Sequence, residues 1–528
     1  MICAIGIFHH EMWRDELEAW LLARDSVSIT NLLENLKYTG HPALWYLCLY
    51  VLAKITPNPT IIQFLQLVIA TGIVLIVVYY GKFTKLQKAL FCFGYFPLYE
   101  YGVISRSYGL GVLLIFSFCA LFCSQNRNFI LIAISLGLLA HTSIYGFIFA
   151  FTFALLLMLM GTRNRDERQK LLLSQKNLKS KLVIAAAIYL FCMSTAMLQM
   201  IPPSNASYKG NLSVVTKQNK SKENKVNSTS NQKSAKLSPV KIIERTSTSI
   251  WRSYVPIPDV SQNNIWGSNF ISDNNNFPEI ASLDSASLIT ASFSLIWLIV
   301  FGFIFRHSYQ AFWVYILGNF IMIIFSFVVK VPEIRHYGHL FILLIACYWI
   351  YNHNRYVQPS LVSLTKLDVN PLTRNFCQVL LTTILFIHLC AGIMMYSVDL
   401  VRPFSNSQKV AQFIRENQWE NSVIVGSKDV YVSPLSAWLN KKIYYPETES
   451  FDTFTVWTSQ KNKKSNQNLS PQDILHQIET LKEHHSENIL LVLDQELKAK
   501  IASIDTKLLV SYEDAIALNE NYYVYSVD

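Results

Sequence analysis

The amino-acid sequence predicts an α-helical polytopic membrane protein of about eleven spans, the first of them truncated, with a small extracytoplasmic α/β domain at the C-terminus. Three observations predict this fold class. Of the 528 residues, 52% are hydrophobic and only 15% are charged, whereas a soluble domain carries about 25% charged residues. Long apolar runs recur up to about residue 400, and helical patterns alternate with strand patterns after it. This composition excludes a soluble multidomain enzyme and a disordered or fibrous chain.

A helix needs roughly 20 apolar residues to cross the hydrocarbon core of a bilayer. Spans are predicted at 60–81, 89–104, 105–123, 128–141, 143–160, 182–200, 286–305, 309–329, 338–351 and 376–397. Residues 1–8 are too short to span and are expected to be the tail of a first span. Residues 43–55 are also short, so we expect them to lie along the outer interface or to re-enter the membrane, and a spanning role stays open.

The distribution of Lys and Arg predicts the orientation, because short cytoplasmic loops of membrane proteins are enriched in these residues. The loop 161–181 is therefore expected inside; its basic residues are Arg163, Arg165, Arg168, Lys170, Lys176, Lys179 and Lys181. Alternation then places on the outer face residues 9–42, Arg106, His141, 201–285, 330–337 and everything after 398. We expect a bacterial inner membrane with an active outer face. Cytoplasmic loops and a lysine-rich insert explain the net charge of +10, so nucleic acid is not indicated as a partner.

The chain is expected to divide at about residue 400, into a membrane domain at 1–400 and an α/β domain at 401–528. The membrane domain carries outer loops at 9–58 and 201–285. Within the second loop, 204–238 is rich in Ser, Asn and Lys and is predicted to be disordered, whereas 239–285 is expected to pack over the membrane domain. The α/β domain is predicted to have helices at 407–417 and 471–484 and strands at 422–427, 488–494, 506–511 and 521–527. It contains no glycine-rich phosphate loop, so a nucleotide role is not supported.

Residues that could do chemistry gather at the outer ends of the predicted spans. Asp15 and Glu16 begin an amphipathic pattern, and such a pair either complements the helix dipole or supplies a general base with a supporting partner. Arg106 begins a span, where an arginine either snorkels to the interface or binds a phosphate through its fork-shaped guanidinium. The other candidates are His41, Tyr108, His141, Lys330, Glu333, Arg335 and His336. Each of these residues is ambiguous alone, and their shared face favours a site.

Four motifs and their order resemble a known family. They are Trp-Arg-Asp-Glu at 13–16, His-Pro-Ala-Leu-Trp-Tyr at 41–46, Ser-Arg-Ser-Tyr-Gly-Leu-Gly at 105–111 and Glu-Ile-Arg-His-Tyr-Gly-His-Leu-Phe at 333–341. With an outer α/β domain, this order is similar to the C-type membrane glycosyltransferases. The nearest branch is the family-39-like and aminoarabinose-transferase-like one, related to protein O-mannosyltransferases. The chain departs from that pattern at Ala43, where the family has a second proline, in its truncated first span and in the insert 204–238.

The resemblance implies transfer of a sugar from a polyprenyl-phosphate donor to a glycan, lipid or protein acceptor on the outer face. It implies that Asp15 is the catalytic base and Glu16 its neighbour. By position it assigns Arg106 and Arg335 to the donor phosphate and matches His41, a substrate-binding candidate, to the histidine of the family's His-Pro motif. Because they lie near these residues on the predicted outer face, Lys330 and His336 are further candidates for the donor phosphate, and Tyr108, His141 and Glu333 are candidates for substrate binding. The chemistry agrees, because a carboxylate deprotonates the attacking hydroxyl and cations stabilise the departing phosphate. No cofactor or metal is required, although a divalent cation is compatible with the sequence.

Two other functions remain as alternatives. A lipid or sugar transporter needs polar groups near the middle of the membrane, often in broken helices, whereas the charges of this chain lie at span ends. A non-catalytic membrane scaffold, whose outer domain binds a partner, is compatible with the truncated first span.

Overall fold

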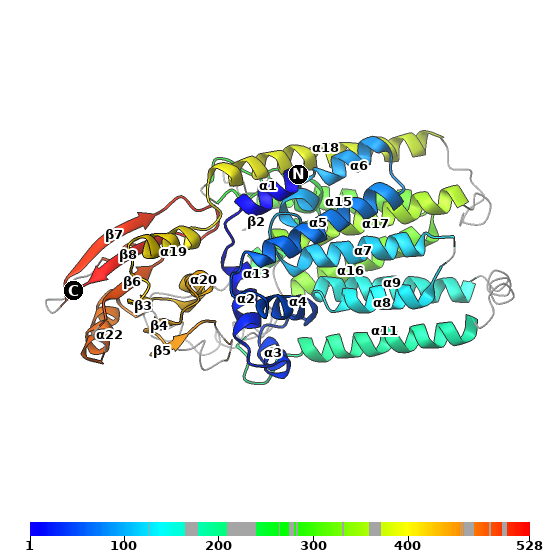
Figure 1. The fold of residues 1–528 in the computed structure, drawn as a ribbon. Helices are drawn as coiled ribbons and strands as arrows, with labels where there is room; N and C mark the ends of the chain where they lie inside the picture. Colours follow the sequence, from blue (N-terminus) through cyan, green and yellow to red (C-terminus); the bar gives the residue numbers. More distant parts are fainter. Residues whose placement is uncertain are drawn as a thin grey trace, which may run out of the picture.

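The protein is mostly helical, and a small sheet lies at its C-terminal end (Figure 1). In the computed structural model, the described residues are 1–125, 127–163, 178–207, 239–262, 264–273, 279–280, 283–329, 332–357, 371–454, 456, 458, 469–484, 487–498 and 504–528. Most of the predicted disordered insert, 208–238, lies outside the described residues, as do most of the basic loop and Lys330.

The helical part is a bundle whose members run side by side (Figure 1). Its helices are α5 (Ile61–Tyr80), α6 (Lys85–Cys92), α7 (Ser107–Phe122), α8 (Phe129–Ala140), α9 (Ile144–Arg163), α11 (Leu178–Met200), α15 (Ser285–Phe305), α16 (Tyr309–Val328), α17 (Ile334–Val357) and α18 (Pro371–Val401). Except for the run at 89–104, each predicted apolar run coincides with one helix. The paired strands β1 (Glu279–Ile280) and β2 (Leu283–Asp284) precede α15.

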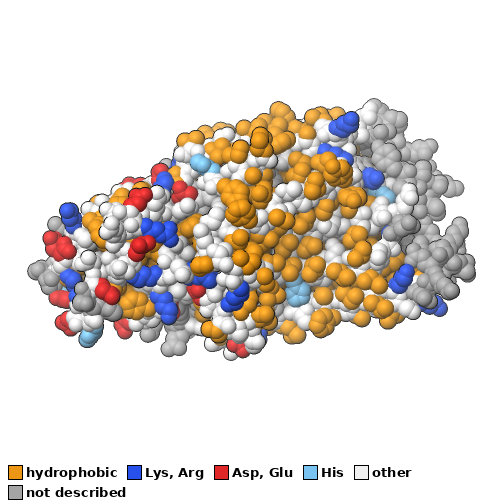
Figure 2. Space-filling model, in the orientation of Figure 1, with side chains coloured by type: hydrophobic (Ala, Val, Ile, Leu, Met, Phe, Trp, Pro, Cys, Tyr) orange, Lys and Arg blue, Asp and Glu red, His pale blue; other side chains and the backbone are white. Residues whose placement is uncertain are grey.

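Within the described residues, five helices are long and apolar enough to cross a membrane: α5, α11, α15, α16 and α18, the last counted from Asn375. Large hydrophobic side chains on these helices are exposed, among them Phe64, Phe191 and Ile299. Figure 2 shows that hydrophobic side chains dominate the face of the bundle, whereas charged ones gather on the C-terminal part. An apolar surface of this extent is typical of contact with lipid. The count of about eleven spans stays a prediction.

The run at 89–104 is not one continuous α-helix. Helix α6 ends at Cys92, Gly94 has an extended backbone, and the π-helical segment η1 (Tyr95–Glu100) follows. Pro97 lies inside η1, and a proline cannot donate the backbone hydrogen bond of a regular helix. The break delivers the buried Tyr101 and Ser105 to the end of the bundle at which α7 begins.

Short helices cover one end of the bundle, the end that faces the sheet (Figure 1). They are α1 (Ile2–His9), α2 (Arg14–Asp25), α3 (Ile29–Leu36), α4 (Leu44–Ala53), α13 (Pro239–Ser247) and α14 (Ser249–Tyr254). Helix α4 corresponds to the predicted run at 43–55. Its 10 residues extend for about 15 Å, half of the roughly 30 Å that a span needs, which agrees with an interfacial position.

The described part of the segment 239–285 packs over the bundle. Trp251, Tyr254 and Trp266 are all at least nine-tenths buried. The indole Nε1 of Trp266 donates a hydrogen bond of 3.0 Å to the carboxylate of Glu100, at the end of η1. The ring of Trp266 also meets the ring of Trp13 edge-on, with centroids 4.9 Å apart. This loop therefore packs against the start of α2.

The C-terminal part is a mixed six-stranded sheet with helices on both faces. The strand order is β5-β4-β3-β6-β8-β7. The strands are β3 (Val423–Gly426), β4 (Ile443–Tyr445), β5 (Ser450–Asp452), β6 (Ile489–Leu493), β7 (Thr506–Tyr512) and β8 (Tyr522–Val527), and the helices are α19 (Ser407–Glu416), α20 (Asp429–Leu439) and α22 (Pro471–His484). This confirms the elements expected after residue 401 and adds α20, β4 and β5.

Alternation along the central strand β3 explains the two covered faces. Val423 and Val425 pack with residues of α22, whereas Ile424 belongs to the larger cluster that includes residues of α19 and α20. Successive side chains of a strand point to opposite faces, so a short run of apolar residues is buried on both sides.

Candidate functional site

The site begins at the first turn of α2, which the sequence predicted as a helix starting near Asp15. Glu16 accepts a hydrogen bond from the backbone N–H of Trp13 at 3.2 Å, and this contact caps the helix. The side chain of Glu16 is fully buried, whereas one fifth of the Asp15 side chain is exposed. The two adjacent acids therefore lie in different environments.

Asp15 contacts both arginines that the sequence singled out. Its Oδ2 atom lies 2.6 Å from Nη1 of Arg106 and 3.1 Å from Nη2 of Arg335. Arg335 also pairs with Glu333, at 2.6 Å between Nη2 and Oε2. Residues from the start of α2, the start of α7 and the start of α17 thus form one charged group, which we call the Asp15 cluster: Asp15, Arg106, Glu333 and Arg335.

Close packing of α17 on η1 explains the position of Arg335. The hydroxyl of Tyr101 donates a hydrogen bond of 2.9 Å to the backbone carbonyl of Arg335. A Cβ atom at Gly338 would collide with the ring of Phe96 and the hydroxyl of Tyr101, so a glycine is required at this contact. The glycine of the motif at 333–341 therefore allows the helix that carries Arg335 to approach the bundle end.

The arginines determine the charge of Asp15. Partial burial alone would favour its protonated form, but Arg106 and Arg335 outweigh that effect and hold the pKa of Asp15 below its ordinary value. Asp15 is thus ionised at neutral pH, and both guanidiniums are partly neutralised by it.

Glu16 belongs to a buried network behind the Asp15 cluster. Its Oε1 accepts a hydrogen bond from the N–H of Ser105 at 2.6 Å, and its Oε2 lies 3.1 Å from Nε2 of His10. The other ring nitrogen of His10 lies 2.8 Å from a carboxylate oxygen of Asp399, at the end of α18. Glu16 is therefore buried behind Asp15, where it contacts the backbone of Ser105 and the ring of His10. His10 and Asp399 were not singled out by the sequence, because their contact joins residues 389 positions apart and no local pattern signals it.

His336 and Tyr108 lie close to the cluster and contact each other. Nε2 of His336 lies 3.1 Å from the Tyr108 hydroxyl, and the guanidinium of Arg106 lies over the Tyr108 ring at 5.6 Å from its centroid. Both side chains are buried. These two predicted site residues therefore lie next to the Asp15 cluster, on its buried side.

His41 and His141 lie toward α4 and α11. The His41 ring lies 6.4 Å from the ring of Tyr46, centroid to centroid. Nε2 of His141 lies 3.1 Å from Oγ1 of Thr195, and the His141 carbonyl accepts a hydrogen bond from Leu44 at the start of α4. The structure thus places His141 at the contact of α4 and α11 with the bundle. Lys330 lies outside the described residues.

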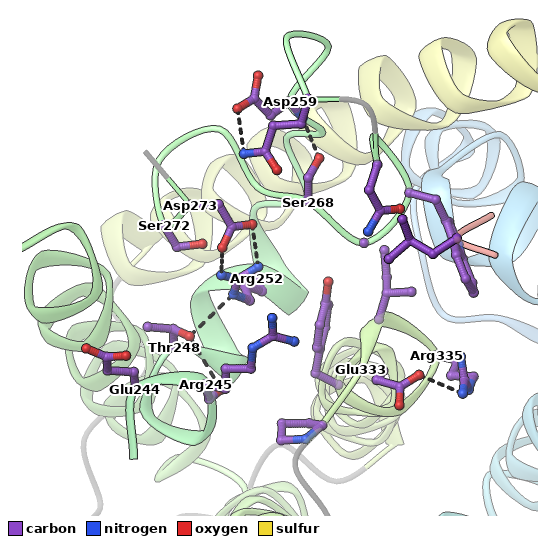
Figure 3. Close-up of a pocket in the computed structure, with 18 of the residues that line it drawn as sticks. Glu244, Arg245, Thr248, Arg252, Asp259, Ser268, Ser272, Asp273, Glu333 and Arg335 are labelled. Atoms are coloured by element: carbon purple, nitrogen blue, oxygen red, sulfur yellow. Dashed lines mark hydrogen bonds and ion pairs between the residues drawn. The ribbon is translucent and has the colours of Figure 1, made fainter. Parts of the chain in front are cut away.

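A cavity of about 930 Å³ opens beside the Asp15 cluster (Figure 3). The start of α2, helices α13 and α14, the loop after α14 and the start of α17 form its walls, and Leu518 of the C-terminal domain reaches it. The lining includes Trp13, Asp15, Arg245, Trp266, Glu333 and Arg335. Its volume falls in the range of small-molecule binding sites, about 300–1,000 Å³.

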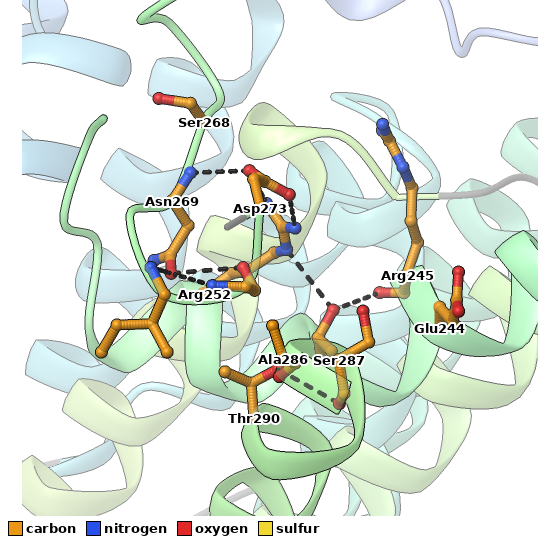
Figure 4. Close-up of polar contacts among 12 residues, drawn as sticks. Glu244, Arg245, Arg252, Ser268, Asn269, Asp273, Ala286, Ser287 and Thr290 are labelled. Carbon is orange, nitrogen blue, oxygen red and sulfur yellow. Dashed lines mark hydrogen bonds and ion pairs between the residues drawn. The ribbon is translucent and has the colours of Figure 1, made fainter. Parts of the chain in front are cut away.

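The wall opposite the Asp15 cluster is built around a second ion pair that sequence reasoning missed. Arg252 donates two hydrogen bonds to the carboxylate of Asp273, which also accepts one from the backbone N–H of Asn269 at 2.7 Å (Figure 4). Arg252 is nine-tenths buried. The pair joins residues 21 positions apart in the loop 239–285, and no periodic pattern in the sequence signals it.

In the described part of the chain, no group of three or more His, Cys, Asp or Glu side chains is arranged to hold a metal ion. What the arrangement offers is an ionised carboxylate held by two guanidiniums on the wall of a polar cavity. Searches against protein-family models, curated proteins and solved structures found no match to this chain.

Proposed function

We propose that this chain is a membrane glycosyltransferase, which moves a sugar from a polyprenyl-phosphate donor to a glycan, lipid or protein acceptor. The observation that carries the proposal is the contact of Asp15 with both Arg106 and Arg335 beside a cavity at the end of an apolar helical bundle. A lipid-linked donor reaches such a place from the bilayer. The reaction needs a carboxylate for the acceptor proton and cations for the departing phosphate, and this group offers both.

In the proposed reaction, the acceptor hydroxyl attacks the anomeric carbon while Asp15 takes its proton. The new C–O bond forms on the face opposite the phosphate, and the bond between the anomeric carbon and the phosphate oxygen breaks. The leaving group is the polyprenyl phosphate, whose additional negative charge Arg106 and Arg335 stabilise. A single displacement of this kind inverts the anomeric configuration.

The low pKa of Asp15 is a difficulty for a general base, because a base works best with a pKa near the working pH. We expect donor binding to raise this pKa. A phosphate on Arg106 and Arg335 competes with Asp15 for the same guanidiniums and adds a negative charge beside the carboxylate. Both effects raise the pKa of Asp15, so we expect the base to become effective when the donor is bound.

We place the reaction on the outer face of a bacterial inner membrane. The basic residues of the loop 161–181 support this orientation through the preference of such loops for the cytoplasm. Helices α2 and α13, whose residues line the cavity, lie at the end of the bundle that faces the C-terminal domain (Figure 1). One orientation therefore places both the cavity and this domain outside.

The proposal is tested with the purified full-length chain in liposomes, supplied with polyprenyl phosphates that carry a labelled hexose or pentose and with envelope extracts as acceptor. We expect label in the acceptor, one free polyprenyl phosphate for each sugar moved, and an inverted anomeric centre by NMR. A double variant, Arg106→Gln with Arg335→Gln, should lose this activity. Movement of the intact donor across the bilayer without cleavage would instead favour a transporter. If no donor is cleaved and no donor is moved, the proposal is contradicted.

A further inference from the structure

The guanidinium of Arg245 faces the cavity from the wall opposite Asp15. Figure 3 shows this side chain directed into the cavity, between the Arg252–Asp273 pair and the Glu333–Arg335 pair. Arg245 is exposed and lies in the last turn of α13. Across the described residues, its side chain takes part in no hydrogen bond or ion pair.

The other arginines of the cavity already have acidic partners. Arg252 is held by Asp273, and Arg335 is shared between Asp15 and Glu333. Arg14 points toward the C-terminal domain, where its Nε lies 4.0 Å from a carboxylate oxygen of Glu520 and its Nη1 donates to the carbonyl of Leu518 at 3.2 Å. Among the described residues, Arg245 is thus the arginine of this cavity that has no acidic partner, and its guanidinium can bind a ligand.

The surroundings of Arg245 suit a polyhydroxylated ligand. Two indole rings, those of Trp13 and Trp266, lie at the cavity together with the ring of Tyr337. Neutral polar side chains line the rest, namely Thr248, Ser261, Gln262, Asn264, Ser268, Ser272 and Ser287. Hydroxyl and amide groups donate and accept the hydrogen bonds that the hydroxyls of a sugar make, and flat aromatic rings pack against its apolar face.

We propose that this wall is the acceptor subsite and that it binds an acidic sugar unit, with the carboxylate or phosphate of that unit on Arg245. A guanidinium binds either oxyanion through two parallel hydrogen bonds, which a neutral sugar cannot accept with the same strength. The name acceptor subsite rests on the proposed glycosyl transfer, whereas the binding of an acidic sugar does not.

The test measures equilibrium binding of glucuronate, glucose 6-phosphate and glucose to the purified full-length chain by ligand-observed NMR, without donor. We expect at least one acidic sugar to bind on the order of tenfold more tightly than glucose, because a hydrogen bond to a charged group is about that much stronger. Arg245→Gln should remove this preference and leave the binding of glucose unchanged. The matched control is Arg306→Gln, an exposed arginine after α15 that does not line the cavity, which should keep the preference.

Equal affinity of the wild-type chain for all three sugars would overturn the assignment. A preference for the acidic sugar that survives Arg245→Gln would also overturn it, and that result is expected if the anion binds to Arg106 and Arg335 instead. Should Arg245→Gln fail to fold, Arg245→Lys decides, since it keeps the charge without the fork and should weaken glucuronate binding about threefold or more. Unchanged glucuronate binding in that variant also contradicts the proposal. Because no step needs a donor, absence of glycosyl transfer leaves the binding result interpretable.

Discussion

The carboxylate of Glu16 accepts a hydrogen bond from the backbone N–H of Ser105 at 2.6 Å, and this contact ties the acidic turn of α2 to the residue before Arg106. One buried side chain therefore fixes the two peptide segments that carry Asp15 and its first arginine. Glu16 acts through these segments, so it is a positioning residue in the proposed reaction.

Glu16→Gln should lower both stability and transfer. Glutamine keeps one oxygen for Ser105, but its NH₂ group faces the N–H of Trp13 and loses the ion pair with His10. We expect a loss of about 1–3 kcal/mol in thermal unfolding and a smaller loss of transfer than on removal of the Asp15 charge. The matched control is Glu34→Gln, an exposed acid on α3, which should change neither quantity. Wild-type stability of Glu16→Gln would show that the buried contacts do not hold α2 in place.

Replacing either arginine of the Asp15 cluster by lysine should weaken donor binding. Lysine keeps the positive charge but cannot bind Asp15 and a phosphate through a fork. In equilibrium binding of a polyprenyl-phosphate sugar, Arg106→Lys and Arg335→Lys are each expected to reduce affinity on the order of tenfold. Arg306→Lys, at the other end of the bundle, serves as the control. If both cluster variants bind the donor as tightly as the wild type, the two arginines serve only the structure.

Glu520 makes stability depend on pH, because it is buried where the C-terminal domain meets α2. Its carboxylate accepts hydrogen bonds from the Ser405 hydroxyl at 2.7 Å and from the N–H of Arg14 at 3.3 Å. Burial raises the pKa of Glu520 to about 7, although Arg14 opposes the shift. Between the ordinary carboxyl pKa and pH 7 the folded chain thus keeps a proton that the unfolded chain has released, so stability falls as pH rises through this window.

Glu520→Gln should remove this part of the pH dependence. The variant is expected to be more stable than the wild type at pH 8, by about 3 kcal/mol at most, and to show a flatter profile of unfolding temperature from pH 5 to pH 8. Glu513→Gln, an exposed acid on the same domain, is the control and should follow the wild type. Parallel profiles for Glu520→Gln and the wild type would contradict the burial of a protonated carboxyl at this contact.

The orientation is tested by reporter fusions. A reporter fused after Asp528 should behave as extracytoplasmic, and one inserted after Arg168 in the basic loop should behave as cytoplasmic, because short loops rich in Lys and Arg are usually cytoplasmic. Alkaline phosphatase and a cytoplasm-only fluorescent protein give opposite signals at each site. Cytoplasmic fluorescence from the fusion after Asp528 would reverse the topology and place the cavity inside the cell.

Sequence patterns predicted the elements well because hydrophobic periodicity is a local property. The runs that became α5, α16 and α22 were predicted within a few residues of their bounds. The break before η1 was missed, although Gly94 and Pro97 signalled it, because the apolar run continued through both.

For the site too, the sequence predicted individual residues but not the contacts between distant segments. The sequence placed Asp15, Arg106 and Arg335 each near the start of a predicted helix and predicted that they share one end of the bundle. The ion pairs of Asp15 show that the three residues meet. Contacts between distant segments could not be predicted. The burial of Glu16 depends on Ser105, and the second wall depends on a loop that folds around Asp273, neither of which leaves a periodic signal.

The central claim is that Asp15 takes the acceptor proton while Arg106 and Arg335 hold the donor phosphate. Its most direct test is the single-turnover rate of sugar transfer by Asp15→Asn, with donor affinity measured on the same preparation. The control is Asp25→Asn, which removes an acid at the far end of the same helix.

We predict that Asp15→Asn transfers sugar about 10²–10⁴ times more slowly than the wild type. Donor affinity should be equal or higher, because the two guanidiniums no longer have a competing carboxylate. A transfer rate for Asp15→Asn that matches the Asp25→Asn control, with donor bound, would contradict the account.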